Sequence, residues 1–374
     1  MSDIAFVRSD MAPSKPAPGS TTGVAAWLKQ NLFASFGDTV LTILAILFVA
    51  WIVPPLYGFV IGNAVPPGGT VEQCRVENVG ACWAYIGSEI EFFIYGFYPM
   101  SEYWRPNIVF ALLVLLGAPM LIPSVPYKVI NAVAFFLVMP VVDTILLSGG
   151  MFGLREVPTE QWGGLLITLI ISVVGISCSL PLGILLALGR QSKLPIVKTL
   201  CIAFIELVRA VPLITVLFMA SIMLPLFMPQ GTSVDKLMRA LVGVTLFSSA
   251  YMAEVVRGGM QAIGRGQYEA ASALGLGYWK RTAFIILPQA LKHVIPGIVG
   301  NFISLLKDTS LVYIVGMKDL LEAVKTKNDA IEWASPTQSV TGYIFAAAVY
   351  WVMCFSISRY SRYWENRLNT GHKR

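Results

Sequence analysis

Residues 165–189 read LLITLIISVVGISCSLPLGILLALG, and this stretch contains no charged side chain. A helix that crosses the hydrocarbon core of a bilayer, about 30 Å thick, needs roughly 20 apolar residues, which this stretch supplies. The rest of the chain is similar: 56% of its 374 residues are hydrophobic, 13% are charged, and the mean hydropathy is +0.69. Soluble domains carry about 25% charged residues. The sequence therefore predicts an all-α, polytopic membrane protein.

Seven further apolar stretches bring the prediction to about eight transmembrane helices. They are expected at residues 39–61, 107–123, 129–148, 199–227, 240–260, 294–317 and 341–358. A cleavable signal peptide would have a basic start and a shorter apolar part, so we expect the first stretch to remain as a span, interrupted by Pro54 and Pro55. Residues 1–38 include a Pro/Ser/Ala/Thr-rich stretch that cannot bury enough surface to fold. This segment is predicted to be a disordered tail.

The basic residues indicate how the chain lies in the membrane. An even number of spans places both termini on one side, and the segments on that side carry 17 Lys and Arg residues against 8 on the other. Cytoplasmic loops are the ones enriched in Lys and Arg. Both termini, including the short tail at residues 361–374, are therefore predicted to be cytoplasmic. Residues 62–106 then form a large outer segment.

Cysteine and histidine positions give no pattern for a metal site. The two histidines, His293 and His372, are far apart, and no CxxC pair occurs, which disfavours zinc and haem attachment. Two alternatives stand for Cys74 and Cys82 in the outer segment: a disulfide if that side is oxidising, or two free thiols. The other three cysteines lie in apolar runs and are interpreted as small packing residues.

The net charge of +6 does not predict a nucleic acid partner. The basic residues lie in short segments between apolar runs, as membrane topology requires, and the chain has no RNP-like or zinc-finger pattern. Membrane lipid is the partner that this distribution indicates.

Charged residues within the predicted spans are candidates for a transport path, because an ionisable side chain at bilayer depth costs about 3 kcal/mol or more. Glu206 and Arg209 are three residues apart, as are Glu254 and Arg257, so each pair can share one face of a helix. The alternative is that both pairs lie near the cytoplasmic ends of their helices and reach water there.

Lys307 and Asp308 lie deeper in their span, where a polar cavity is the favoured explanation. As neighbours on a helix they point about 100° apart and cannot easily pair. Asn301 precedes Asp308 by two helical turns and can share its face. The candidate substrate-pathway residues are Glu206, Arg209, Glu254, Asn301, Lys307, Asp308 and Ser310. No catalytic residue is proposed, and Asp143 in the third span is assigned no role.

The longest inner loop is predicted at residues 258–293, GGMQAIGRGQYEAASALGLGYWKRTAFIILPQALKH. Its pattern predicts two short helices, 268–274 and 278–286, separated by Gly275 and Gly277 and ended by Pro288. Helices of this length are not stable alone in water, so we expect the unit to dock on a partner. Ala270, Ala271 and Leu274 would supply the apolar face for that contact.

The spacing within this loop resembles the EAA motif of ABC importer permeases. The seven matching positions are Glu269, Ala270, Ala271, Gly275, Ile285, Leu287 and Pro288. Residues 250–259 before the motif and 306–311 after it are similar to the polar amino acid (histidine/glutamine-type) subgroup. The subgroup often has Arg-Gly-Thr-Pro-Leu where residues 209–213 read RAVPL, so contacts through that glycine and threonine are in doubt.

This resemblance implies an architecture. Residues 162–360 would form the five-span permease core with the coupling loop at 258–293, and residues 39–161 would add three spans and the outer segment. That longer form resembles the extended permease subunit of general L-amino acid uptake systems of Gram-negative bacteria. The expected location is then the bacterial inner membrane.

The resemblance also implies partners. A cytoplasmic ABC ATPase dimer would receive the seven motif residues, a periplasmic amino acid binding protein would deliver substrate, and a second, different permease chain would complete the pore. The chain has no GxxxxGK[ST] phosphate loop, so we expect it to be no enzyme and to hold no cofactor, with ATP and Mg on the partner ATPase.

Two other classes of function compete with an importer of polar L-amino acids. An ion-gradient-driven carrier or channel would explain the membrane charges equally well but not the glycine-hinged loop. An integral membrane enzyme would need a catalytic constellation, and the sequence has no His-rich cluster or nucleophile signature. The enzyme is ranked last.

Overall fold

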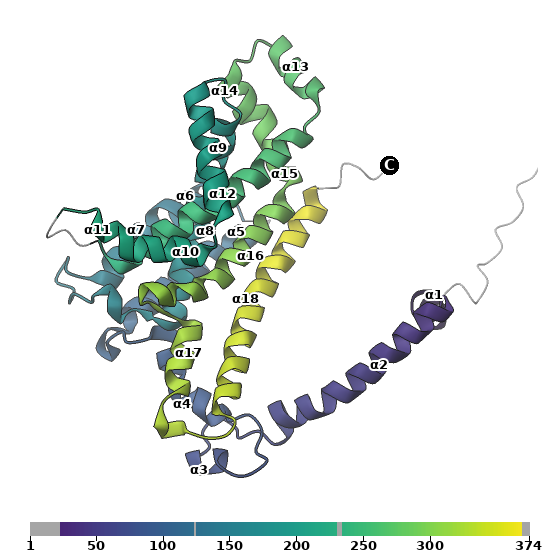
Figure 1. The fold of residues 1–374 in the computed structure, drawn as a ribbon, viewed down its shortest axis with the longest axis vertical. Coiled ribbons are helices and arrows are strands. Elements are labelled where there is room, and N and C mark those ends of the chain that lie inside the picture. The colour runs from purple at the N-terminus through teal and green to yellow at the C-terminus, as the bar shows by residue number, and fades with distance from the viewer. Residues whose placement is uncertain (1–22, 123–124, 230–233, 369–374) are drawn as a thin grey trace, which may run out of the picture. The chain divides into compact units, whose positions relative to one another are not determined.

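The computed structural model describes residues 23–122, 125–229 and 234–368, and this part of the chain is almost entirely helical (Figure 1). Its single named strand, β1, is the two-residue Lys318–Asp319. The prediction of an all-α protein is confirmed. By contacts the chain divides into two compact units, one of residues 1–64 and 78–81 and the other of residues 65–77 and 82–374.

The first unit contains two helices. α1 spans Val24–Asn31 and α2 spans Phe36–Tyr57, which a π-helical turn, Gly58–Gly62, continues. Ser35 caps α2 by accepting a hydrogen bond from the Asp38 N–H. The predicted tail of residues 1–38 is therefore wrong for its last part, because residues 24–31 are rich in helix formers such as Ala and Leu. Residues 1–22 lie outside the described residues.

The second unit holds the remaining helices. In chain order they are α3 Val71–Cys74, α4 Trp83–Tyr95, α5 Trp104–Leu121, α6 Lys128–Val133, α7 Met139–Ser148, α8 Gly164–Arg190, α9 Pro195–Ala210, α10 Leu213–Phe218, α11 Leu224–Leu226, α12 Lys236–Ala262, α13 Arg265–Ala273, α14 Tyr278–Arg281, α15 Leu287–His293, α16 Ile295–Asp308, α17 Leu320–Asn328 and α18 Gln338–Leu368.

Within the described residues, six helices are long and apolar enough to cross a membrane. They are Phe36–Gly62, Ile130–Ser148, Gly164–Arg190, Lys236–Ala262, Ile295–Val315 and Gln338–Asn366. A bent pair adds a seventh candidate, and Trp104–Met120 is apolar but shorter. Each of the eight predicted spans thus has a helical counterpart.

The span predicted at 199–227 is not one straight helix. It breaks between Pro195–Ala210 and Leu213–Leu226, whose axes differ by 106°. Val211 at the break is extended, with φ −112° and ψ 148°. Because Pro212 disfavours the helical conformation of the residue before it, the proline fixes the position of this break.

Other prolines are accommodated inside continuous helical segments. α2 runs through Pro54 and Pro55, so these residues do not interrupt the first span. Three π-helical turns, Ala134–Val138, Met219–Met223 and Thr282–Ile286, each end two residues before a proline, at 140, 225 and 288. A widened turn gives room for a residue that lacks an N–H and whose ring crowds the preceding turn.

The end predicted for the second loop helix is therefore wrong. It does not stop at Pro288 but continues through the π-helical turn Thr282–Ile286 into α15, which ends at His293.

α8 and α12 form the central helix pair of the second unit. Gly183 permits their close approach, since a Cβ atom there would lie 2.6 Å from the Cβ of Met252. Two apolar clusters extend from this pair. One surrounds Leu166, Ile171 and Val244. The other surrounds Met252 and includes Ile286 and Ala290, from the connection between α12 and α16.

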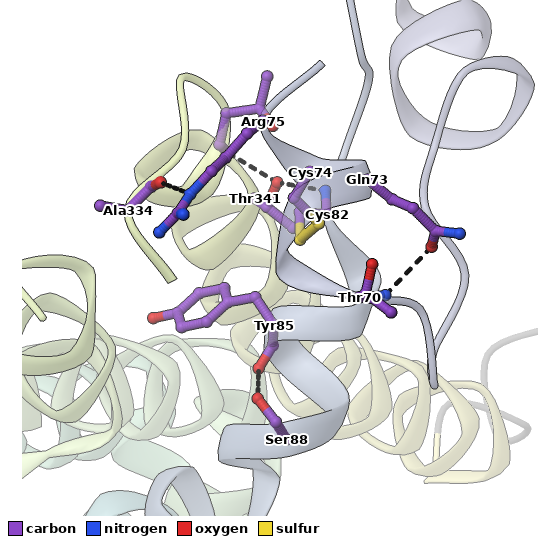
Figure 2. The surroundings of a disulfide bond; sticks show 10 residues. Thr70, Gln73, Cys74, Arg75, Cys82, Tyr85, Ser88, Ala334 and Thr341 are labelled. Carbon is purple, nitrogen blue, oxygen red and sulfur yellow. Dashed lines mark hydrogen bonds between the residues drawn. A yellow bond between two sulfur atoms is a disulfide. The ribbon is translucent and has the colours of Figure 1, made fainter. Parts of the chain in front are cut away.

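The outer segment is closed by a disulfide between Cys74 and Cys82, whose Cα atoms are 5.6 Å apart (Figure 2). Of the two alternatives that the sequence left open, the structure has the bonded form. The Cys82 N–H donates to Thr341 Oγ1 at 3.0 Å, and Arg75 Nε donates to the Ala334 carbonyl at 3.1 Å (Figure 2). The closed loop is thus tied to the connection between α17 and α18.

α4, which follows this loop, packs on α17. Lys327 Nζ pairs with Glu89 Oε2 at 2.6 Å and lies over the Phe92 ring, and the Tyr85 hydroxyl donates to Asn328 Oδ1 at 3.0 Å. Tyr85 is fully buried, and this burial raises the pKa of its phenol. α4 is therefore part of the core of the second unit.

Replacing the disulfide should loosen this region. In Cys74→Ser/Cys82→Ser, loss of the cross-link should lower the stability of the outer segment by about 2–4 kcal/mol, because its unfolded form gains freedom. Amide hydrogen exchange across residues 70–95 should become faster, whereas Cys354→Ser, which removes a free thiol, should leave it unchanged. Unaltered exchange in the double variant would show that the noncovalent contacts suffice.

Candidate functional site

Five charged side chains from three helices meet around Glu254. Arg190 ends α8, Glu206 and Arg209 lie on α9, and Glu254 and Arg257 lie on α12. The Glu254 carboxylate pairs with all three arginines, at 3.1 Å from Arg190, 3.7 Å from Arg209 and 2.8 Å from Arg257. We call this set the Glu254 network. It links the ends of α8 and α9 to the last third of α12.

The pairing within this network differs in part from the predicted one. Glu254 and Arg257 do form the expected pair three residues apart. Glu206, however, pairs with Arg190 at 2.7 Å, and Arg209 turns to Glu254. The spacing rule compares residues of one helix only, so it could not identify Arg190, which approaches from α8. The Glu254 side chain is 16% exposed and that of Glu206 is 54% exposed, so Glu254 holds the less hydrated position.

A small polar pocket lies between α12 and α16. It has a volume of about 280 Å³ and is lined by Phe247, Ser248, Tyr251, Asn301, Ser304, Leu305 and Asp308. Asn301 and Asp308, two turns apart on α16, do share one face, as the sequence predicted. The Asn301 Nδ2 group is buried and has no hydrogen-bond partner within the described part of the chain. An amide donor and a carboxylate are therefore both available to a polar ligand here.

Arg209 connects the pocket to the Glu254 network. Its guanidinium lies 5.5 Å from the centroid of the Tyr251 ring while it pairs with Glu254. A cation over a tyrosine face is stabilised by the ring quadrupole. Tyr251 thus contacts the network on one side and lines the pocket on the other.

Two candidate residues, Lys307 and Ser310, belong neither to the Glu254 network nor to the pocket lining. Lys307 is exposed, and the Ser310 hydroxyl donates to the Lys307 carbonyl at 2.9 Å, within the same helical segment. The seven predicted candidates therefore separate into three groups: the network residues Glu206, Arg209 and Glu254, the pocket residues Asn301 and Asp308, and these two.

Sequence reasoning missed three polar residues of the pocket, Ser248, Tyr251 and Ser304, although helical spacing could have indicated them. Ser304 follows Asn301 by three residues, and Ser248 precedes Tyr251 by three, so each pair shares a face of its helix. These hydroxyls are uncharged, and the search for costly charges therefore passed over them.

The inner loop forms the expected helix, turn and helix. α13 ends at Ala273, Gly275 adopts a left-handed φ of +73°, and α14 begins at Tyr278. The Gly275 N–H donates to the Ser272 carbonyl at 2.9 Å, and the Leu276 N–H donates to that of Ala271 at 3.2 Å. Such a left-handed residue after a helix favours glycine, which has no Cβ.

Other contacts fix the loop against the chain. The Tyr268 hydroxyl donates to the Met260 carbonyl at 3.1 Å, and Arg281 donates to the Ser272 hydroxyl at 2.8 Å. Burial raises the pKa of the Tyr268 phenol. Glu269 and Ala270 are exposed, but Ala271 is buried, which contradicts its expected place on the apolar docking face. Consecutive helical residues point in different directions, so Ala270 and Ala271 divide between the two sides.

The exposed apolar surface of this loop is larger than the sequence indicated. Leu274, Trp279 and Phe284 are 78%, 70% and 72% exposed. Soluble and interfacial surfaces with several large exposed apolar side chains mark sites of association. We call these three exposed side chains the docking face of the loop, because the sequence predicts that this unit docks on a partner. Among the described residues no group of three or more His, Cys, Asp or Glu side chains could hold a metal ion.

Neutralising Glu254, at the centre of the charge network, should reduce the stability of the protein more than neutralising Glu206, at its exposed edge. Glu254→Gln leaves three arginines facing a neutral amide, and we expect the free energy of unfolding to fall by about 1–3 kcal/mol. Glu206→Gln, the matched control at an exposed position, should cost less than about 1 kcal/mol. Thermal melting of both variants in detergent compares the two losses. Equal losses would mean that Glu254 is not the centre of the network.

Comparison with known proteins places this geometry in a family. The model of the "Binding-protein-dependent transport system inner membrane component" family matches residues 179–370. The chain is 49% identical to the inner membrane amino-acid ABC transporter permease protein YhdY of Escherichia coli K12, over 96% of this chain and 97% of that protein.

Two other relatives show how far the likeness extends. The glutamate/glutamine/aspartate/asparagine transport system permease protein BztC of Rhodobacter capsulatus is 39% identical over the full length of both chains. The probable glutamine ABC transporter permease protein GlnP of Bacillus subtilis is 32% identical over 55% of this chain and 92% of its own. The resemblance to extended ABC importer permeases is confirmed, and the chain belongs to the binding-protein-dependent transport system inner membrane component family.

Proposed function

We propose that this chain is the membrane-spanning permease subunit of an ABC importer that takes up polar L-amino acids. The alignment with YhdY, which covers almost the whole of both chains, is the observation that carries this proposal. The polar pocket between α12 and α16 adds a chemical reason. Its carboxylate, amide and hydroxyl groups suit a small polar ligand with an ammonium group.

The docking face of the inner loop is the proposed contact with a cytoplasmic ABC ATPase. The loop connects α12 to α16, and these are the two helices that line the pocket. A displacement of the loop would therefore move both pocket walls without any further mechanical link. ATP and Mg would be bound and the ATP hydrolysed on the ATPase, and this chain would hold no nucleotide and catalyse no reaction.

Alternating access would follow from rigid-body movement of these helices. The Glu254 network lies where α8 and α9 meet α12, so its ion pairs are suited to hold one arrangement of the three helices. The pair between Arg190 and Glu206 is the more exposed part of this network, and exposed ion pairs are individually weak. This contact can therefore exchange during a cycle without a large energetic barrier. A binding protein would deliver the amino acid on the opposite side of the membrane.

We further propose that both termini are cytoplasmic in a bacterial inner membrane and that a second permease chain completes the translocation path. The distribution of Lys and Arg supports the orientation. An ion-gradient-driven carrier remains the competing function, and it gives no role to the exposed apolar loop. Uptake into vesicles with and without internal ATP and purified ATPase separates the two, because a carrier would be indifferent to both.

The loop should be essential for ATPase binding. Gly275→Val places a β-branched residue at φ +73°, which is strained even though the surrounding space is open. We expect the amount of ATPase that copurifies to fall about tenfold, equivalent to about 1.4 kcal/mol of binding free energy. Glu269→Lys should have a similar effect through charge reversal at an exposed position.

Gly266→Ala is the matched control for the loop variants, because that glycine has an ordinary φ and no neighbour within 4 Å. It should copurify with ATPase like the parent chain. Normal copurification and uptake by Gly275→Val would remove the coupling role from this loop.

The pocket should determine substrate affinity. Asp308→Asn removes the carboxylate that would bind an ammonium group, and loss of such a charged hydrogen bond, about 1.5–3 kcal/mol, predicts a KM for uptake that is about 10- to 100-fold higher. Ser310→Ala lies two residues away but outside the lining, so it should change KM less than about twofold. Initial uptake rates of labelled amino acids measure both values. An unchanged KM in Asp308→Asn would place the substrate elsewhere.

A further inference from the structure

A second and larger cavity lies apart from the polar pocket, between α5, α7, α8 and α12. Its volume is about 760 Å³, within the range of sites that hold a drug-sized ligand. Its walls are apolar almost throughout, including Phe110, Leu113, Leu169 and Leu241. A polar amino acid would lose its hydration here without replacement, so this cavity does not fit the proposed transported substrate.

Most polar side chains of the cavity gather at one end, and Thr245 lies farther along α12. Asp143, Thr144 and Ser148 belong to the last turns of α7, Thr159 lies in the connection to α8, and Asp235 caps the start of α12. The Val157 N–H donates to the Ser148 carbonyl, and the Thr159 hydroxyl donates to the Asp235 carboxylate, so the end of α7 lies close to the start of α12. The opposite part of the cavity is lined by apolar residues farther along α8 and α12. The cavity therefore has a polar end and a longer apolar part, which is the distribution of polarity that an amphiphilic ligand would match.

Asp143 is the group at the polar end that lacks a partner. Its Oδ1 atom is buried and accepts no hydrogen bond in the described part of the chain. Asp235, by contrast, accepts hydrogen bonds from the Thr159 hydroxyl and the Met238 N–H. Thr144 also has a partner, since its hydroxyl donates to the Pro140 carbonyl at 2.7 Å. The Asp143 carboxylate therefore lacks a hydrogen-bond donor.

None of the cavity-lining residues is basic. The donor must accordingly come from the occupant, and a cationic N–H group would complement the Asp143 carboxylate best. A donor group joined to apolar chains at membrane depth is found in a lipid with a primary ammonium headgroup. Its chains would lie along α8 toward Cys178 and Leu182, which line the apolar part. Cys178 is exposed to this space, so it is not the packing residue that the sequence predicted.

We propose that this cavity binds an aminophospholipid, with its ammonium group on Asp143 and its acyl chains between α5, α7, α8 and α12. Two of the four helices that line the site, α5 and α7, precede the segment matched by the family model. It would therefore be a lipid site that belongs to the extended form of the permease. The proposal is independent of the transported substrate.

The test compares phosphatidylethanolamine with phosphatidylcholine, whose headgroup has the same charges but no N–H. The purified full-length chain is delipidated in mild detergent, titrated with each lipid, and the bound lipid is counted by native mass spectrometry. We expect phosphatidylethanolamine to bind about tenfold more tightly, as one charged hydrogen bond predicts. Asp143→Asn should reduce this preference to about twofold, whereas Thr144→Val, beside it, should retain it.

A second variant tests the apolar part. Cys178→Phe fills the space expected for the acyl chains and should weaken binding of both lipids equally, without changing the preference between them. Equal affinity of the parent chain for the two lipids would overturn the proposal, and so would a full tenfold preference in Asp143→Asn. Crosslinking of Cys178 to a protein segment in the assembled complex would also overturn it, because the cavity would then hold a helix.

Discussion

The cost of charge in a medium of low dielectric constant is the constraint on which the arrangement of the second unit depends. Glu254 lies in the last third of α12, a helix long and apolar enough to cross a membrane, and it has three arginines around it. Such a group requires partners from other helices, because its own helix can offer only one at the right spacing. The requirement fixes where α8 and α9 approach α12.

The same helix connects this charge network to the pocket and to the loop. Tyr251 lies one turn before Glu254 and faces both Arg209 and the pocket. The loop that follows α12 leads after two short helices into α16, which supplies the other wall of the pocket. In the proposed coupling, a displacement of the loop would move both walls at once, and the ion pairs at the ends of α8 and α9 would resist that movement.

The sequence was sufficient for features that depend on local pattern and insufficient for those that depend on packing. Apolar runs predicted every span, and Gly275 predicted the turn, because hydropathy and positive φ are properties of one segment. The apolar run 199–227 predicted a span here, but the 106° bend within it does not follow from hydropathy. Arg190 as the partner of Glu206, the burial of Ala271 and the hydroxyls of the pocket all arise from contacts between helices, which spacing along one helix does not contain.

The N-terminal extension shows why an added segment can become structurally necessary. A relative such as GlnP aligns over 92% of its length with only 55% of this chain, so a permease of this family can exist without a region of that size. Here, however, α4 of the extension buries Tyr85 and Phe93 and pairs with α17 through Glu89 and Lys327. Removal of α4 would leave Lys327 without its carboxylate partner and would expose to water the apolar surfaces of α17 and α18 that α4 covers. The extension is therefore held by the same balance of burial and charge pairing that organises the core.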